Sequence, residues 1–400
     1  MDARALRPSQ VDEQQFSVAF NFPVIFARGV LSSGDGALAW AITQREPERR
    51  HPLFVVLDGG LVQASPALQP DLLAYCRRYA DRLELRGDPL VVPGGEAVKN
   101  DPHWVTQLQA AFAGARLDRH AVVLVVGGGA VLDAAGFAAA TAHRGLRLVR
   151  MPTTVLSQSD GGLGVKNGIN AFGAKNFIGT FAVPFAVLND AELLRTLSPR
   201  ESRAGMAESV KVALLRDAQF FAWLEQEADA LREGSLEPLA QLVRRGGAIH
   251  LAQIREGGDP FELGSSRPLD YGHWAAHKLE VLSGHELRHG EAVAIGMLLD
   301  ARYAELQGLL PSADLQRIAS LLQRLGLPTY HPALEQRAGG ELTLMRGLDE
   351  FREHLGGALT ITLLRGIGRS TEVSSIDNEQ MARAIGWLAQ RARDGAVSAD

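Results

Sequence analysis

The stretch AVVLVVGGGAVLDAAGFAAA, residues 121–140, decides the fold. It consists of an apolar strand-like run, three consecutive glycines and an apolar helix-like run. Gly127, Gly128 and Gly129 let the backbone approach a pyrophosphate, whose charge suits the N-terminus of the following helix. The spacing departs from the GxGxxG dinucleotide fingerprint, and a tight turn that needs positive φ accounts for the same glycines. The stretch predicts a nucleotide-binding crevice, with a plain turn as the alternative.

Strands and helices alternate around this stretch through the first half of the chain. The strand-like segments are FVVLDGG (54–60) and PLVVPGGE (89–96), and the helix-like ones are 71–85 and 104–115. This alternation indicates parallel βαβ units. From about Leu197 onward, long amphipathic segments replace the strand signals. We therefore expect an α/β, Rossmann-like nucleotide-binding domain over residues 1–195 and a mainly α-helical domain, binding metal and substrate, over 196–400.

Composition limits the function classes. The 400 residues are 46% hydrophobic and 22% charged, as in soluble globular proteins, and exceed the usual size of one hydrophobic core. A net charge of -5 gives no overall basic footprint for nucleic acid. We expect no membrane span, because no run of 18 apolar residues occurs. The single cysteine, Cys76, and the polar first residues without a signal peptide favour a cytoplasmic, reducing compartment.

Polar side chains follow the predicted strands and mark one edge of the sheet. They are Asp58 after the first strand, Glu96 and Lys99 after the next, and Thr153, Thr154 and Asp160 after a further one. The carboxyl ends of parallel strands form the ligand crevice of an open α/β sheet. An acid in the position of Asp58 can bind a ribose hydroxyl or the adenine side of a nucleotide.

A basic, glycine-rich segment, residues 159–181, lacks apolar periodicity and predicts a loop. It carries Lys166, Asn170, Lys175 and Asn176 among six glycines. Such a loop suits an anionic small molecule, especially a phosphate. The alternative is an ordinary solvated loop, which its four large apolar residues disfavour because they should tether it.

A carboxylate and several histidines in the second half form a candidate metal site. Glu208 and Lys211 share a face of a predicted helix whose other residues are apolar, whereas a surface ion pair is the plain alternative. His273 and His277 are four apart, and His289 precedes a strongly apolar helix. Two imidazoles and one carboxylate make a Zn²⁺ site with open positions, although histidine spacing alone equally fits structural roles.

The chain resembles the 3-dehydroquinate synthases and the wider sugar phosphate cyclase family from about Asp58 to Gly368. The motifs that carry the resemblance are GGGAVLDAAGFAAATAHRG, MPTTVLSQSD, KNGINAFGAKNFIGTF, LSPRESRAGMAESVK, GHWAAH and HGEAVAIGM. The resemblance implies Zn²⁺, or Co²⁺, on Glu208, His273 and His289. It implies NAD bound through Asp58, Glu96, Lys99, Gly128, Gly129, Asp133, Thr153, Thr154, Asp160 and Lys175. It implies substrate contacts from Lys166, Lys175, Asn176 and Lys211, with His277 in a polar or proton-relay position.

The resemblance also implies an assembly and a reaction. Arg144 matches an arginine that reaches the phosphate of a neighbouring subunit, so a homodimer is expected. The family reaction cyclises a seven-carbon sugar phosphate: NAD takes a hydride from an alcohol, phosphate leaves by β-elimination, the hydride returns, and an intramolecular aldol step closes the carbocycle. His285 matches no family position and is expected at the surface.

Departures from the family pattern concern the carboxylate of the 3-dehydroquinate synthase substrate. A family lysine falls near Ala252, Arg267 is one residue closer to the GH motif, and Asp270 replaces an asparagine. A Lys-Lys pair becomes Arg352-Glu353. An aspartate would repel a carboxylate. The segment DPFE…RPLDYGHW resembles instead the epi-valiolone synthases, which cyclise sedoheptulose 7-phosphate but often carry proline at the position of His277.

The overall pattern is most similar to the cyclase-like proteins of bacterial ebo gene clusters. We therefore expect a substrate with a neutral head group, such as sedoheptulose 7-phosphate. The alternatives are a 3-dehydroquinate synthase with a rebuilt carboxylate pocket, an NAD-dependent polyol dehydrogenase, and a non-catalytic sensor. The lysine-rich loop argues against the dehydrogenase, because polyols carry no phosphate.

Overall fold

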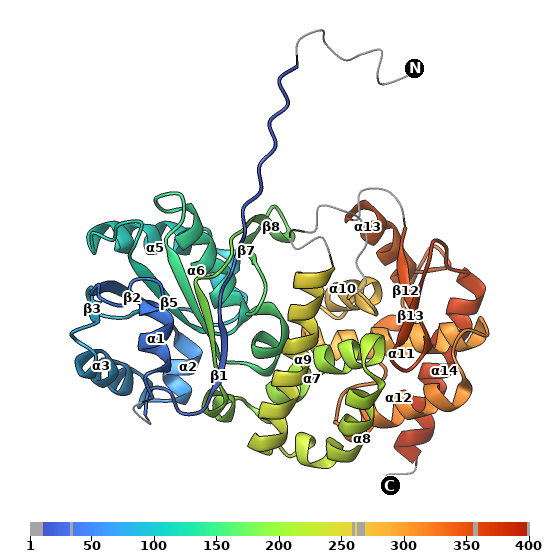
Figure 1. The fold of residues 1–400 in the computed structure, drawn as a ribbon. Helices are drawn as coiled ribbons and strands as arrows, with labels where there is room; N and C mark the ends of the chain where they lie inside the picture. The colour runs from blue at the N-terminus through green and yellow to red at the C-terminus, as the bar shows by residue number, and fades with distance from the viewer. Residues whose placement is uncertain (1–10, 33–34, 258–260, 262–268, 355–358, 398–400) are drawn as a thin grey trace.

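The first half of the chain forms one parallel sheet (Figure 1). The structure is a computed structural model and describes residues 11–32, 35–257, 261, 269–354 and 359–397. Seven strands lie in the order β1-β9-β6-β5-β2-β3, with β4 also pairing β2. Every pair is parallel. The strands are β1 (Val24–Ala27), β2 (His51–Asp58), β3 (Leu83–Leu85), β4 (Leu90–Val92), β5 (Val122–Gly127), β6 (Arg147–Pro152) and β9 (Ala186–Asp190).

Helices cover both faces of this sheet, which is why its central strands are apolar along their whole length. One core joins the sheet to α1, α2 and α3, and a second joins its other face to α5 and α6. These helices, with the short α4, are α1 (Ala37–Thr43), α2 (Gly59–Ala64), α3 (Leu68–Arg78), α4 (Ala97–Asn100), α5 (His103–Gly114) and α6 (Gly129–Thr141). The predicted Rossmann-like α/β half is confirmed.

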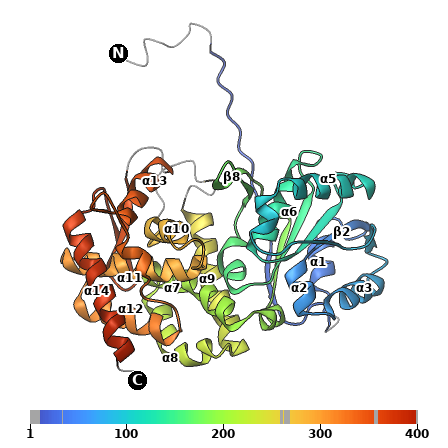
Figure 2. The ribbon, with the colours of Figure 1, turned by 180° about the vertical axis from the view of Figure 1, so that it is seen from behind.

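The second half is mainly helical, also as predicted (Figure 2). Its helices are α7 (Pro199–Arg216), α8 (Ala218–Arg232), α9 (Leu236–Glu256), α10 (His273–Leu282), α11 (His289–Leu306), α12 (Ser312–Arg324), α13 (Arg346–His354) and α14 (Asn378–Val397). Two antiparallel pairs accompany them, β10 (Arg337–Ala338) with β11 (Glu341–Leu342) and β12 (Ile361–Gly366) with β13 (Arg369–Val373). Among the described helices, none combines the length and apolarity that crossing a membrane requires.

Helices α7 and α11 lie at the centre of the helical half. Thirteen of the eighteen residues of α7 are buried, and so are fourteen of the eighteen of α11. A capping box formed by Ser198 and Glu201 fixes the start of α7, and Pro199 occupies its first position. Helices buried on nearly all sides show little amphipathic periodicity, so their polar residues are the ones that need explanation.

Two local predictions were wrong. The helix-like segment 71–85 ends its helix at Arg78 and continues as β3, because Leu83–Leu85 pairs with β2. The glycine-rich segment 159–181 is largely ordered structure instead of a loop. It begins with a π-helical turn (Ser157–Gly161) and continues as an antiparallel hairpin of β7 (Lys166–Ala171) and β8 (Ala174–Phe181). Tertiary pairing overrides local propensity in both segments.

Candidate metal centre and nucleotide crevice

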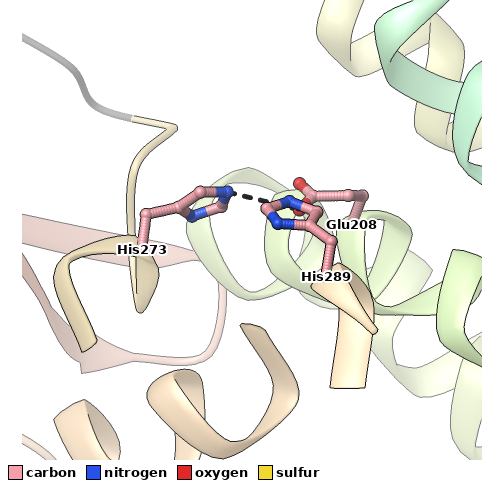
Figure 3. Close-up of side chains that lie close together, drawn as sticks. All are labelled: Glu208, His273 and His289. Carbon is pink, nitrogen blue, oxygen red and sulfur yellow. Dashed lines mark ion pairs between the residues drawn. The ribbon is translucent and has the colours of Figure 1, made fainter. Parts of the chain in front are cut away.

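Three helices of the second half bring one carboxylate and two imidazoles together (Figure 3). Glu208 lies in the middle of α7, whereas His273 and His289 are the first residues of α10 and α11. Nε2 of His273 lies 3.4 Å from Oε1 of Glu208, and Nε2 of His289 lies 3.5 Å from the same oxygen. One ligand atom from each residue lies within 4.8 Å of the others. The structure thus assembles the three residues predicted to bind a metal.

Two glycines let the three helices approach closely enough. A Cβ on Gly290 would lie 1.8 Å from the carbonyl oxygen of Ala204, which is on α7. A Cβ on Gly296 would lie 2.1 Å from the carbonyl oxygen of Gly272, the residue before His273. Real Cβ atoms do not approach this closely, so glycine is required at both places. The helix spacing that positions the cluster therefore depends on residues that are not part of it.

The carboxylate of Glu208 is deeply buried, and its surroundings are positive. Its side chain is 2% exposed and forms an ion pair with Lys211. Burial by itself raises the pKa of Glu208, but Lys211 and His273 outweigh it and hold the pKa well below its usual value. Within the described residues, neither carboxylate oxygen accepts a hydrogen bond of normal geometry. Buried oxygens that face two imidazoles in this way fit a divalent cation.

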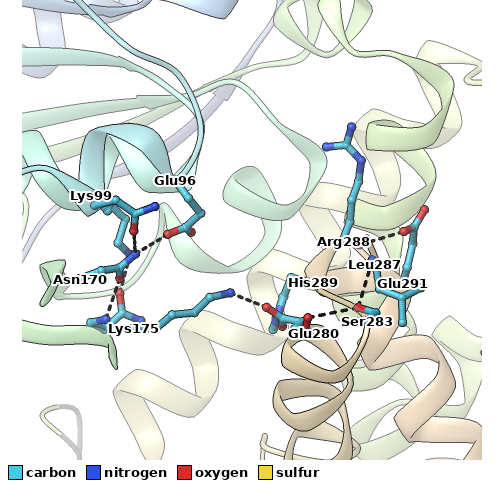
Figure 4. A network of polar contacts seen from close by, with 12 residues as sticks. Glu96, Lys99, Asn170, Lys175, Glu280, Ser283, Leu287, Arg288, His289 and Glu291 are labelled. Carbon is cyan, nitrogen blue, oxygen red and sulfur yellow. Dashed lines mark hydrogen bonds and ion pairs between the residues drawn. The ribbon is translucent and has the colours of Figure 1, made fainter. Parts of the chain in front are cut away.

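Glu280 is a second buried carboxylate that the sequence analysis did not identify (Figure 4). Its Oε1 lies 2.8 Å from Nδ1 of His289, and its other oxygen forms an ion pair with Lys175. Burial raises the pKa of Glu280, but the contacts with His289 and Lys175 outweigh it and lower the pKa to about 2. A carboxylate on Nδ1 leaves Nε2 of His289 as the atom that faces Glu208. The spacing His273, His277, Glu280 on one helix face was the signal that could have revealed it.

The other histidines of the segment differ in environment. His277 is exposed at the edge of the cluster, with its ring centroid 5.5 Å from that of His273 and 6.1 Å from that of His289. Desolvation by the surrounding protein, followed by the two imidazoles, lowers the pKa of His277 to about 3. It is therefore neutral near pH 7, where a ring nitrogen without a proton can accept a hydrogen bond. His285 is exposed in the turn after α10, as expected.

The glycine stretch and the strand ends form a crevice at the carboxyl edge of the sheet. Gly128 caps α6 without any side-chain hydrogen bond, and a Cβ on Gly129 would meet no atom within 4 Å. A glycine at the start of this 13-residue helix leaves room beside its N-terminus, which suits a pyrophosphate. Oδ2 of Asp58 accepts a hydrogen bond from the Gly128 amide at 3.3 Å, and its Oδ1 caps α2. Asp58 thus holds the glycine loop in place.

The β7–β8 hairpin spans from this crevice toward the metal cluster. The buried amine of Lys99 donates to Oδ2 of Asp133 at 2.7 Å and also to Oδ1 of Asn176. Nearby, Asn170 Nδ2 donates to Oε2 of Glu96 at 2.8 Å. Because Lys175 lies next to Asn176 and pairs with Glu280, the hairpin joins the nucleotide crevice to the carboxylate that supports His289.

The remaining crevice residues lie near the end of β6. The Thr153 amide donates to the carbonyl oxygen of Gly127 at 3.1 Å, and the hydroxyl of Thr154 lies 2.8 Å from that of Ser157. Asp160 lies in the π-helical turn and raises the pKa of Lys211, although burial of that lysine and the closer Glu208 have larger effects. Asp160 therefore links the crevice electrostatically to the metal cluster.

Two predicted substrate residues are not drawn into the cluster. Lys166 begins β7 with an exposed side chain. Arg144 follows the far end of α6, a helix of 13 residues that runs for about 20 Å away from the glycine loop. Arg144 is therefore remote from the crevice of its own subunit, as a residue that serves a neighbouring subunit would be.

The positions that depart from the family pattern lie in different settings. Asp270 lies just before α10, where its carbonyl oxygen accepts a hydrogen bond from the His273 amide at 3.0 Å, and its charge makes a small contribution that raises the pKa values of Lys211 and His277. Ala252 is half-buried on α9, and Arg352 is exposed and pairs with Asp349. Arg267 and the side chain of Glu353 lie outside the described residues.

Comparisons with known proteins agree with this geometry. Residues 89–204 match the model of the 3-dehydroquinate synthase N-terminal domain, and residues 205–345 match that of its C-terminal domain. The 3-dehydroquinate synthase of Acinetobacter baylyi is 36% identical over 84% of this chain and 95% of its own length. The 2-epi-5-epi-valiolone synthase of Streptomyces glaucescens is 37% identical over 79% of this chain and 83% of its own length.

A solved structure extends the match to the whole fold. ValA, a 2-epi-5-epi-valiolone synthase from Streptomyces hygroscopicus subsp. jinggangensis 5008 solved with NAD⁺ and Zn²⁺ bound, superposes with a TM-score of 0.83. It is 29% identical and covers 95% of this chain and 99% of its own. The matched domains, the identities and the shared fold together confirm the resemblance seen in the motifs: the chain belongs to the 3-dehydroquinate synthase family of sugar phosphate cyclases.

Proposed function

We propose that the protein is an NAD- and Zn²⁺-dependent cyclase of a seven-carbon sugar phosphate, with Co²⁺ as an alternative metal. The cluster of Glu208, His273 and His289, joined through Glu280 and Lys175 to the hairpin that contacts Lys99, carries this proposal. When bound, the metal would polarise a substrate hydroxyl and NAD would take and return its hydride. We also propose that residues 1–195 bind NAD and that residues 196–400 bind the metal and the substrate.

The chain's own residues meet the remaining demands of the reaction. Lys211 is held protonated beside Glu208, because the pKa-raising effect of that carboxylate outweighs the burial of the amine. Lys175 and Asn176 on the hairpin would hold the substrate between the crevice and the metal, with Lys166 at the hairpin entrance. His277 would take the polar or proton-relay position at the cluster edge. Arg144 would neutralise the phosphate in a partner subunit, which implies a homodimer.

The NAD-binding set follows the crevice. We assign its pyrophosphate to Gly128 and Gly129 at the N-terminus of α6. The other contacts come from Asp58, Glu96, Lys99, Asp133, Thr153, Thr154, Asp160 and Lys175. Lys99 is the central member, because its amine joins an acid of the sheet half to the hairpin.

We further propose sedoheptulose 7-phosphate as the substrate, giving an epi-valiolone-type cyclitol. The observation in its favour is the acidic residue Asp270 directly before α10, next to His273, where its charge would repel the carboxylate of 3-deoxy-D-arabino-heptulosonate 7-phosphate. That compound, the substrate of a 3-dehydroquinate synthase, stays the alternative.

The test is a product-identified assay with purified protein, NAD and Zn²⁺. We expect sedoheptulose 7-phosphate to release inorganic phosphate and give a carbocycle without net formation of NADH. Turnover of the carboxylate substrate alone would refute the substrate assignment, and net NADH formation would indicate a dehydrogenase. No phosphate release from any seven-carbon sugar phosphate would refute the cyclase.

A metal-content measurement tests the site separately. Glu208→Ala should abolish Zn²⁺ retention, whereas Glu237→Ala should retain it, because Glu237 lies in the first turn of α9 with a side chain that is 84% exposed. Equal zinc content in both variants would refute the metal assignment.

A further inference from the structure

The chain begins, in its described part, with an extended arm that leaves the body of the protein. This N-terminal arm, residues 11–23, belongs to none of the described strands, and residues 11–20 are exposed throughout. Its last residue, Pro23, accepts a hydrogen bond from the Val187 amide of β9 at 3.0 Å. Figures 1 and 2 both show it passing the β7–β8 hairpin and continuing outward beyond the molecule. Such a segment is either a solvated tail or a piece of an interface.

The sequence of the arm is that of a strand with one apolar face. Phe16, Val18, Phe20 and Phe22 alternate with small or polar residues in FSVAFNF. This period of two places all four side chains on one side of an extended backbone. Phe16 is 87% exposed and Val18 is 63% exposed, which is unusual for a contiguous apolar face in a solvated tail.

The β7–β8 hairpin exposes a matching apolar face. Phe177 and Phe181 both belong to β8, and the Phe172 ring lies 5.3 Å from that of Phe177. These rings are 85%, 61% and 44% exposed for Phe172, Phe177 and Phe181. Among the described strands β8 pairs with β7 alone, so its other edge is open to a further strand. Two-stranded hairpins are marginally stable by themselves, so a third strand would stabilise this one.

Charge and contact favour the same pairing. Asp12 and Glu13 are the charged residues of the arm, and Lys166 and Lys175 are those of the hairpin, so the two segments carry opposite charge. Phe20 already packs on Phe261 at 5.9 Å between ring centroids, and Phe261 packs on Phe181 at 5.6 Å. The base of the arm is therefore anchored beside the hairpin of its own subunit.

The arm continues past this anchor, and its direction favours a second copy of the chain as the protein that it contacts. Residues 11–19 span about 30 Å when extended, and they lead away from the described body of their own subunit. A second copy of the chain presents the same hairpin, and a two-fold axis would let each arm reach the hairpin of the other.

We propose that the arm docks as an additional strand on the β7–β8 hairpin of a second copy of this chain, in a reciprocal exchange. Phe16 and Val18 then cover Phe172 and Phe177 of the partner, and backbone hydrogen bonds form along the open edge of β8. Because the hairpin carries Lys175 and Asn176, assembly would also steady the segment that joins the crevice to the metal cluster.

Crosslinking between different chains tests the proposal directly. Cys76 is buried, so an introduced cysteine is the reactive thiol of each variant. Chains carrying Phe16→Cys are mixed with differently tagged chains carrying Phe172→Cys and treated with a short bismaleimide. We expect a mixed-tag product at twice the chain mass of 43.0 kDa. Crosslinking that occurs only within a single chain carrying both substitutions would refute the exchange and show that the arm docks on the hairpin of its own chain. No crosslinked product, either between chains or within one chain, would refute the docking itself.

Solution mass provides the second measurement. The double variant Phe16→Asp/Val18→Asp should raise the dimer dissociation constant at least about tenfold, because each side chain is lost twice in a two-fold pair. Trp40→Asp on α1, which removes an aromatic ring that is 54% exposed, is the matched control and should leave it unchanged. A monomeric parent chain, or a dimer equally stable in both variants, would contradict the proposal. Both readouts measure assembly alone, so they hold whether or not the chain is a cyclase.

Discussion

Replacing Glu280 by glutamine tests whether the buried carboxylate behind His289 supports metal binding. Glu280 accepts from His289 at 2.8 Å in the interior, and such a charge-assisted bond contributes about 1.5–3 kcal/mol. Glutamine keeps the shape and a neutral hydrogen bond of about 1 kcal/mol, so the net loss is about 0.5–2 kcal/mol. That loss corresponds to an affinity for Zn²⁺ lower by about 2- to 30-fold.

The chemical reason is the choice of imidazole tautomer. The carboxylate can only accept, so it keeps the proton on Nδ1 and leaves Nε2 free toward Glu208. A glutamine amide can turn and donate to Nδ1, which favours the tautomer that cannot bind a metal through Nε2. The substitution also removes the anionic partner of Lys175.

The assay is a competition titration of Zn²⁺ against a chromophoric chelator. Glu350→Gln is the matched control. Glu350 lies on α13 and forms an ion pair with Lys278, which shares α10 with Glu280, but the Glu350 side chain is exposed. An affinity in Glu280→Gln equal to that of the control would refute the reasoning, and Glu280 would then serve only to position Lys175.

Three further predictions address spacing, the nucleotide crevice and pH. Gly290→Ala should force α11 away from α7, lower the free energy of unfolding by about 1–3 kcal/mol and cause loss of zinc. The control Gly386→Ala should change neither stability nor zinc content, because a Cβ there meets no atom within 4 Å. Equal denaturation midpoints for the two variants would contradict this prediction. Lys99→Met should weaken NADH binding by about tenfold in a fluorescence titration, because it leaves Asp133 and Asn176 without the amine that both accept from. The control variant Lys278→Met, which loses an ion pair with Glu350, should bind NADH as the parent does. Burial raises the pKa of Asp300 to about 7, against the opposing bonds from Trp274 and Gly272, so the folded state binds this proton more strongly than the unfolded chain. The stability gained from this proton is complete below about pH 4 and is lost as pH rises through about 7. Asp300→Asn should therefore reduce the fall in unfolding free energy between about pH 4 and pH 7. A pH profile from denaturant titrations that is the same in the variant and the parent would show that Asp300 does not titrate in this range.

Long periodic segments made much of the fold predictable. The alternation of apolar runs and helices in the first half predicted the parallel sheet, and the three glycines after Val126 predicted a nucleotide site at the edge of that sheet. Glu208 with Lys211, and His289 before an apolar helix, were polar residues in apolar surroundings, which is the signal that makes a buried site visible in one sequence.

Other features depended on partners far away in the chain. The segment 159–181 has loop composition, yet β7 packs against α6 and pairs with β8, which makes it a hairpin. Residues 83–85 continue a helical pattern but pair with β2. Neither local sequence contains the strand that it joins.

The sequence by itself determined which chemical groups the protein carries and the order in which helices and strands present them. Only the tertiary structure decided that Glu280 supports His289, that Gly290 and Gly296 set the spacing of the ligand helices, and that Arg144 lies remote from its own crevice. The physical reason is that periodicity describes one element at a time. A distance of a few ångströms between residues some 80 positions apart depends on how separate helices pack, and that packing is a property of the whole core.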